Sequence, residues 1–157
     1  MKKIDEPTPL NDVADFHQTF NLPILDDPVI PSAERCKLRI NLIEEELKEL
    51  KEAIDDNDLI EVADAFCDIQ YVLSGAILEF GLGQKFKALF EEVQRSNMSK
   101  TCKTMDAAQA TQSHYFEKDG TESEIVERNG EYIVYRKADG KVLKSINYSP
   151  ADLKQFI

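Results

Sequence analysis

Acidic side chains are concentrated in residues 44–68, which contain eleven Asp and Glu residues but only two lysines. Carboxylate oxygens are preferred ligands of Mg²⁺, and carboxylates also serve as general bases. An exposed helix carries the same residues as solvated charges. The position of each acid relative to the apolar residues therefore indicates whether the acids form a metal-binding or catalytic site or only a solvated helix face.

The first acids lie on a helix that we predict from about Ser32, a plausible N-cap, to Ile54. Its apolar residues recur every three or four positions and form one stripe. Glu46 and Glu49 lie at the margin of that stripe, where both side chains can turn toward a neighbouring helix. Lys48 is near enough to the acids for pairs along the helix, so a solvated face suffices for this helix alone.

The next predicted helix, from about residue 59 to 80, has apolar residues on nearly all sides and so belongs in the middle of a structure. Its acids form one narrow stripe, which consists of Glu61, Asp64 and Asp68 and is extended by Tyr71 and Gly75. Buried like charges cost several kcal/mol each unless compensated. No Lys or Arg occurs between Leu59 and Gln84. We therefore expect the positive charge to come from another helix or from a cation.

If the two helices form an antiparallel hairpin, their acids face each other across the seam. The facing residues are then Glu45, Glu46 and Glu49 on one side and Glu61 and Asp64 on the other. An oxygen-only ligand set suits Mg²⁺ or Mn²⁺. A di-iron centre is disfavoured because neither His17 nor His114 has a Glu three residues earlier, and zinc is disfavoured as well.

The elements that must position these acids are four helices joined by short links, predicted at about 10–20, 32–54, 59–80 and 84–97. After residue 100 we predict a short helix at about 106–116. Alternating residues around the turns at Asn129 and Asp139 then predict a β-hairpin with room for a third short strand. The fold class is all-α, a four-helix bundle core with a small C-terminal β-hairpin appendage. The expected parts are a helical domain, residues 1–100, and an extension, residues 101–157, packed on it.

Composition excludes several function classes. The chain has 157 residues, 42% of them hydrophobic and 31% charged, and a net charge of −11. That charge disfavours nucleic acid or an anionic membrane surface as the main partner, but it permits a phosphorylated ligand bridged by metal ions. The three cysteines show no CxxC spacing and are interpreted as reduced thiols. With neither a signal peptide nor an apolar span of membrane length, we expect a cytoplasmic protein.

The acids also carry a family pattern. EELKE, residues 45–49, followed by EVAD, residues 61–64, resembles the EExxE…ExxD signature of the MazG-like all-α nucleoside triphosphate pyrophosphohydrolases. That superfamily includes the phosphoribosyl-ATP pyrophosphohydrolases and the dimeric dUTPases. The segments DFHQTFNLP, VQRSNMSK and YRKADGKVLKSINYSPADL resemble one bacterial branch of it, so the resemblance extends over most of the chain. The stretch from about residue 101 to 131 is longer here than in the shorter members.

The resemblance implies Mg²⁺-dependent cleavage of a nucleoside triphosphate between the α- and β-phosphates, giving nucleoside monophosphate and pyrophosphate. The implied metal ligands are Glu45, Glu46, Glu49, Glu61 and Asp64. Either Glu45 or Glu46 orients or deprotonates the attacking water. The implied substrate contacts are Asn97 and Lys100 at phosphate oxygens, where cations at a helix C-terminus are also favoured by the helix dipole, and His17 and Gln18 at the base. Asp68 and Tyr71 continue the acidic stripe and are interpreted either as a metal-shell or ribose contact or as a hydrogen-bonded core pair. For His17, plain packing beside Phe16 and Phe20 is the competing interpretation.

The family also implies a homodimer or a dimer of dimers, which agrees with an excess of apolar surface for so few elements. Removal of dUTP or non-standard triphosphates is the preferred function. The alternatives are phosphoribosyl-ATP hydrolysis in histidine synthesis and a non-catalytic helical module that binds a protein partner. Replacing Glu49 by Gln distinguishes these alternatives, because an enzyme should lose turnover with its fold intact, whereas a binding module should lose nothing measurable.

Overall fold

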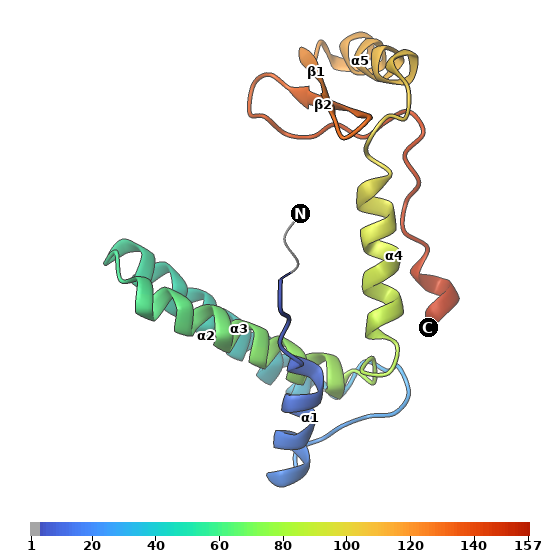
Figure 1. Cartoon of the computed structure of the whole chain (residues 1–157). Coiled ribbons are helices and arrows are strands. Elements are labelled where there is room, and N and C mark those ends of the chain that lie inside the picture. The colour runs from blue at the N-terminus through green and yellow to red at the C-terminus, as the bar shows by residue number, and fades with distance from the viewer. Residues whose placement is uncertain (1–3) are drawn as a thin grey trace. The chain divides into compact units, whose positions relative to one another are not determined.

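The computed structural model describes residues 4–157. Within this range it has five α-helices, a two-stranded sheet and one short 3-10 helix (Figure 1). In chain order these are α1 (Pro9–Thr19), α2 (Ala33–Asp55), α3 (Leu59–Glu79), α4 (Phe86–Met98), α5 (Met105–Asp119), β1 (Ser123–Arg128), β2 (Glu131–Arg136) and η1 (Leu153–Phe156). The predicted all-α core with a small C-terminal hairpin is confirmed. The chain divides into two compact units, the first ending at Phe86 and the second running from Lys87 to Ile157.

The helices begin where their local sequences predict. The Ser32 hydroxyl accepts a hydrogen bond from the backbone N–H of Arg35 at the start of α2. Asp58 caps α3 by accepting from the backbone N–H groups of Ile60 (2.9 Å) and Glu61 (3.2 Å). Asn57, with φ of 55°, turns the chain between α2 and α3.

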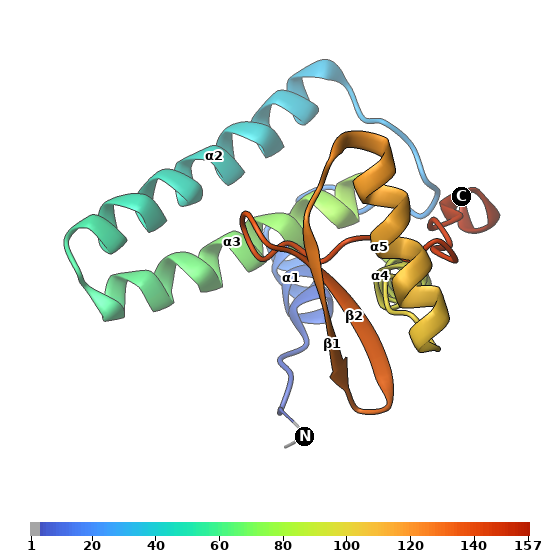
Figure 2. The same ribbon diagram turned by 90° about the horizontal axis from the view of Figure 1, so that it is seen from above.

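The first unit is built on a hairpin of α2 and α3, with α1 packed against α3. Both views show α2 and α3 running side by side in opposite directions, joined by a tight turn (Figures 1 and 2). The buried side chains of α3 come mainly from its second half, Ser74 to Glu79. The signature acids lie toward the turn end of this hairpin.

The second unit contains α4, α5 and the antiparallel pair β1–β2. Its buried core consists of Cys102, Ala108, Val134 and Leu143. The strands are joined by Asn129 and Gly130, both with positive φ (53° and 77°), as the Asn-Gly turn signal predicts. The expected third strand is reduced to an isolated bridge between Tyr135 and Val142.

The helix α4 belongs to the same compact unit as the C-terminal segment. The predicted division into a helical domain, residues 1–100, and an extension, residues 101–157, stays a prediction. Hydrogen bonds join the C-terminal segment to α4. Asp152 N donates to Glu92 Oε1 (2.9 Å), and Ser149 N donates to Ser99 Oγ (3.0 Å).

No helix within residues 4–157 is long and apolar enough to cross a lipid bilayer. The expectation that the chain has no signal peptide concerns its N-terminus, where residues 1–3 lie outside the described range.

Candidate active site

The signature acids project from the two antiparallel helices near their connecting turn. On α2, Glu46 is half-buried, while Glu45 and Glu49 are exposed. On α3, both signature acids, Glu61 and Asp64, are exposed, while Asp68, one turn beyond the signature, is half-buried. Glu46 and Asp68 are therefore the half-buried acids of this region, one on each helix.

The pKa of Glu46 depends on the neighbouring acids. Burial raises the pKa of Glu46 above its ordinary value, and the repulsion of four neighbouring carboxylates raises the pKa further. In order of decreasing effect these neighbours are Asp68, Glu49, Glu45 and Asp64. The structure thus brings five of the predicted acids together electrostatically. Glu61, in the first turn of α3, is not among the groups that act on Glu46.

The register of the hairpin explains this grouping. Arg35 pairs with Glu79, and the side chain of Arg39 lies against Gly75. From the first pair to the second, the residue number rises by four on α2 and falls by four on α3, as expected for antiparallel helices. Continued toward the turn, the same register pairs Glu46 with Asp68, the carboxylate that acts most strongly on the pKa of Glu46.

The end of the hairpin away from the turn holds a buried ionic network. The carboxylate of Glu79 is only 1% exposed and accepts hydrogen bonds from Arg35 Nε (3.1 Å) and from Arg39 Nη2. Burial alone would raise the pKa of Glu79, but the hydrogen bonds from Arg39 and Arg35 outweigh burial and hold the pKa below its ordinary value.

His17 of α1 completes this network. Its ring is 2% exposed, with Nδ1 2.8 Å from the carbonyl oxygen of Pro23 and Nε2 3.2 Å from Arg39 Nη2. A guanidinium donates only, so Nε2 must accept and Nδ1 must carry the proton that is donated to Pro23. The network therefore requires a neutral His17 in one tautomer.

Sequence reasoning missed the arginines of this network and Glu79, although a signal was present. Glu79 lies one turn beyond Gly75, the last residue of the predicted stripe of α3, and Arg39 lies on the face of α2 that carries Glu46. Gly75 leaves the space that the arginine occupies, because a Cβ there would lie 2.7 Å from Arg39 Nη1. Another helix does supply positive charge, as the sequence allowed, but both arginines pair with Glu79.

The donor set of the signature acids fits a hard divalent cation. All of these donors are carboxylate oxygens, and the charges of Glu49, Glu45 and Asp64 add to burial in raising the pKa of Glu46. Among residues 4–157, no three Asp, Glu, His or Cys side chains converge closely enough to form a complete metal site. Binding a cation would require the exposed side chains to turn inward, which long Glu side chains on a helix surface do easily.

The other predicted contacts lie in both units. Tyr71 makes an edge-to-face contact with Phe16 of α1, with 5.5 Å between ring centroids, and Gln18 is exposed. In the second unit, Lys100 Nζ donates to Asn97 Oδ1 (2.8 Å). Contacts of these residues, of Asp68 and of His17 with a substrate stay predictions. The structure gives His17 an internal role in addition.

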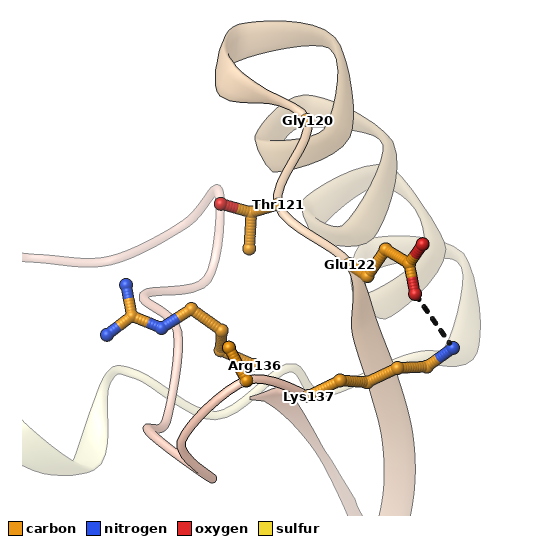
Figure 3. A pocket seen from close by; sticks show the side chains of 6 residues that line it. Gly120, Thr121, Glu122, Arg136 and Lys137 are labelled. Atoms are coloured by element: carbon orange, nitrogen blue, oxygen red, sulfur yellow. Dashed lines mark ion pairs between the residues drawn. The ribbon is translucent and has the colours of Figure 1, made fainter.

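A cavity of about 430 Å³ lies in the second unit, between the end of α5 and the end of β2 (Figure 3). Its charged residues already have partners: Lys137 pairs with Glu122 (3.5 Å), and Arg136 pairs with Asp139 (2.6 Å). Because these charges neutralise each other, the cavity offers less to a charged ligand than the acidic end of the α2–α3 hairpin.

Comparison with known proteins identifies a family that the chain matches. The profile of the phosphoribosyl-ATP pyrophosphohydrolase family matches residues 13–97, more than half of the chain and including all of α2 and α3. The chain is also 33% identical over 96 residues to uncharacterized protein L479 of Acanthamoeba polyphaga mimivirus. That alignment covers 56% of this chain and 37% of the mimivirus protein, so the chain spans well under half of its relative's length.

Proposed function

Because the chain belongs to the phosphoribosyl-ATP pyrophosphohydrolase family, we propose that it hydrolyses a nucleoside triphosphate between the α- and β-phosphates with the help of Mg²⁺. The products are a nucleoside monophosphate and pyrophosphate. The observation that carries this proposal is the gathering of like-charged carboxylates around Glu46, on two helices inside the matched region. Such a cluster is unfavourable alone and becomes favourable when it holds cations.

Glu46, Glu49, Glu61 and Asp64 are the proposed metal ligands. Mg²⁺ bound there neutralises the triphosphate and lowers the pKa of a water molecule. Glu46 faces α3, which supports its role as a ligand rather than as a base. Glu45 is exposed one position earlier on α2 and is the proposed residue that orients the attacking water and accepts its proton.

The proposed substrate contacts are those that the family resemblance suggests. Asp68, one turn beyond Asp64, and Tyr71, about one turn further, are assigned to the ribose. Asn97 and Lys100 of the second unit are assigned to phosphate oxygens, because both side chains are hydrogen-bond donors. Gln18 is exposed on α1 and is assigned to the base together with His17.

Two substrate classes deserve comparison. We favour dUTP and non-standard nucleoside triphosphates, which a house-cleaning enzyme would remove. Phosphoribosyl-ATP is the second candidate, because the matching family is named for its hydrolysis. A panel containing both classes, assayed for pyrophosphate release with and without Mg²⁺, separates them.

The decisive variant is Glu49→Gln, which removes one proposed ligand charge from an exposed position and should leave the fold intact. We expect turnover to fall by about a hundredfold or more, because a lost metal ligand weakens both metal binding and catalysis. The matched control is Glu52→Gln on the same helix, whose carboxylate pairs with Lys48 (3.3 Å).

Equal activity of the Glu49→Gln variant and the wild type would contradict the assigned site. If no substrate released more pyrophosphate with Mg²⁺ than without it, the proposal that the protein is a pyrophosphohydrolase would be contradicted. That second result would favour a non-catalytic module whose acids are simply solvated.

A further inference from the structure

The C-terminal segment, residues 144–152, lies along α4 and is fixed there by several hydrogen bonds. Ser145 N donates to the Lys100 carbonyl oxygen (3.2 Å), and the hydroxyl groups of Tyr148 and Ser96 are 3.0 Å apart. Farther along, Arg95 Nη1 donates to Ser149 Oγ (3.0 Å). The segment therefore has a defined position on the helix, outside the region that the family profile matches.

This arrangement gathers positive charge around one phenol. Lys144 Nζ lies 4.4 Å from the centroid of the Tyr148 ring. The hydrogen bond from Ser96 lowers the pKa of Tyr148 most, and the charges of Lys144, Lys100 and then Arg95 lower it further. Two segments that are distant in sequence, the end of α4 and the residues after β2, thus contribute cations to one place.

Lys100 and Lys144 differ from neighbouring cationic side chains in having no acidic partner among the described residues. Arg95 is neutralised by Glu92 (2.7 Å), and Lys103 is paired with Glu131. Neither Lys100 nor Lys144 has a carboxylate within 4.0 Å in the part of the chain that the structure describes. In a protein with a net charge of −11, a pair of lysines without acidic partners is a local exception that an anion would neutralise.

The hydrogen-bond donors suit phosphate oxygens. Each ammonium group donates up to three hydrogen bonds and accepts none. With Ser96 as the donor to Tyr148, the phenol proton of Tyr148 is left to donate to an anion. Charge-assisted hydrogen bonds of this kind are the strong ones in phosphate recognition.

We propose that Lys100, Lys144 and the Tyr148 hydroxyl form a phosphate-binding site for a polyphosphate, which the C-terminal segment completes by adding Lys144 and Tyr148 to α4. The identity of the ligand rests on the proposed function, because a pyrophosphohydrolase binds the β- and γ-phosphates of its substrate. A free polyphosphate such as pyrophosphate has the same chemistry, and the experiment below distinguishes the two sources.

The primary measurement is calorimetric titration of the full-length protein with sodium pyrophosphate in EDTA, so that no metal ion contributes. We expect Lys144→Gln to weaken binding about tenfold, because it removes one charge-assisted donor. Lys144→Arg should retain most of the affinity. Circular dichroism of each variant should match the wild type.

The matched control is Lys118→Gln in the same unit. Lys118 also lies over a tyrosine ring, with Nζ 5.9 Å from the Tyr115 centroid, so its loss removes the same charge and a similar contact. Pyrophosphate binding should not change in this variant. Equal affinities for the Lys144→Gln and Lys118→Gln variants, or no binding of pyrophosphate by the wild type, would overturn the proposal.

Kinetics with Mg²⁺ and a triphosphate then identify the source of the phosphate. A KM raised about tenfold in Lys144→Gln with nearly unchanged kcat assigns the site to the substrate's outer phosphates. An unchanged KM, with weakened pyrophosphate binding, assigns it to a separate polyphosphate. If no triphosphate is hydrolysed, the proposed function fails while the EDTA titration still decides whether this site exists.

Discussion

Glu46 and Glu79 lie on the two facing helices of one hairpin, yet their pKa values move in opposite directions. Glu79 is surrounded by guanidinium groups, so its pKa is lowered in spite of burial. Burial raises the pKa of Glu46, and the carboxylates around it raise the pKa further instead of opposing burial. The identity of the neighbours, rather than the depth of burial, therefore separates a carboxylate with a structural role from one suited to hold a cation.

Gly75→Ala tests the packing of the ionic network. A helical Gly→Ala change normally stabilises by about 1 kcal/mol. Here the added Cβ would lie 2.7 Å from Arg39 Nη1 and 3.0 Å from His17 Nε2. The guanidinium of Arg39 is held through its other terminal nitrogen, Nη2, which contacts His17 Nε2 and donates to Glu79. We expect a net loss of about 1–2 kcal/mol, because overpacking outweighs the helix propensity. Chemical denaturation followed by circular dichroism measures it.

The control is the same change in an Arg39→Ala background, where the obstructing side chain is absent. There Gly75→Ala should be neutral or stabilising, which gives a clear coupling energy in a double-mutant cycle. Equal effects in both backgrounds would show that Arg39 does not determine the need for glycine.

At the scale of the hairpin, the α2–α3 pair should depend on pH through Glu79. Its folded-state pKa is below the ordinary value of 4.5, so ionised Glu79 stabilises the fold above that value. The stabilisation is lost as the pH falls from about 5 toward the lowered folded-state pKa. Replacement by Gln removes this contribution and leaves two arginines without their acid, so Glu79→Gln should cost about 3 kcal/mol near neutral pH.

The measurement is the difference in Tm between the wild type and Glu79→Gln at several pH values. The difference should be largest near pH 7 and should shrink on acidification, while other carboxylates such as Glu92, with a pKa of about 2, affect both proteins equally. Glu91→Gln, at an exposed pair with Lys87, should hardly change Tm at any pH. A difference that does not vary with pH would contradict an ionic role for Glu79.

The sequence predicted the elements well because their signals are local. Asp58 at the start of α3 and Asn129 in the hairpin turn act on residues no more than three positions away. Helical periodicity also gave each acid its side of the helix, but the sequence predicted that Glu46 faces Glu61 and Asp64, whereas Asp68 acts on it most strongly. The ion pairs of Glu79 lie 40 and 44 residues away in sequence, so periodicity alone does not select the partners.

The C-terminal segment was missed for a related reason. Residues 145–152 have no regular helical or strand pattern, and their hydrogen bonds to α4 join residues about 50 positions apart. No single-sequence signal specifies that contact.

At the scale of the whole molecule, exposed apolar side chains support self-association, which the sequence led us to expect. On α2 and α3 these include Ile54, Leu59, Ile60 and Phe66. Monomers seldom expose so many large apolar residues on one hairpin. We predict that the protein sediments at a multiple of the 17.9 kDa chain mass and that Phe66→Glu shifts it toward the monomer.

Phe116→Glu on α5 provides a matched control. Phe66 is 56% exposed and Phe116 is 60% exposed, both on helices, so the substitutions are chemically alike. Sedimentation of the Phe116→Glu variant should resemble the wild type. Dissociation by Phe116→Glu and not by Phe66→Glu would place the contact on the second unit instead.

The missing side chain at Gly75 also predicts how this sequence can diverge. A mutation that enlarges residue 75 crowds Arg39, and shortening Arg39 first leaves Glu79 with one partner fewer. Either change alone should therefore destabilise the fold, whereas the two changes together should recover part of the loss. Reconstructed intermediates that carry only one of the two changes should have a lower Tm than proteins that carry both or neither.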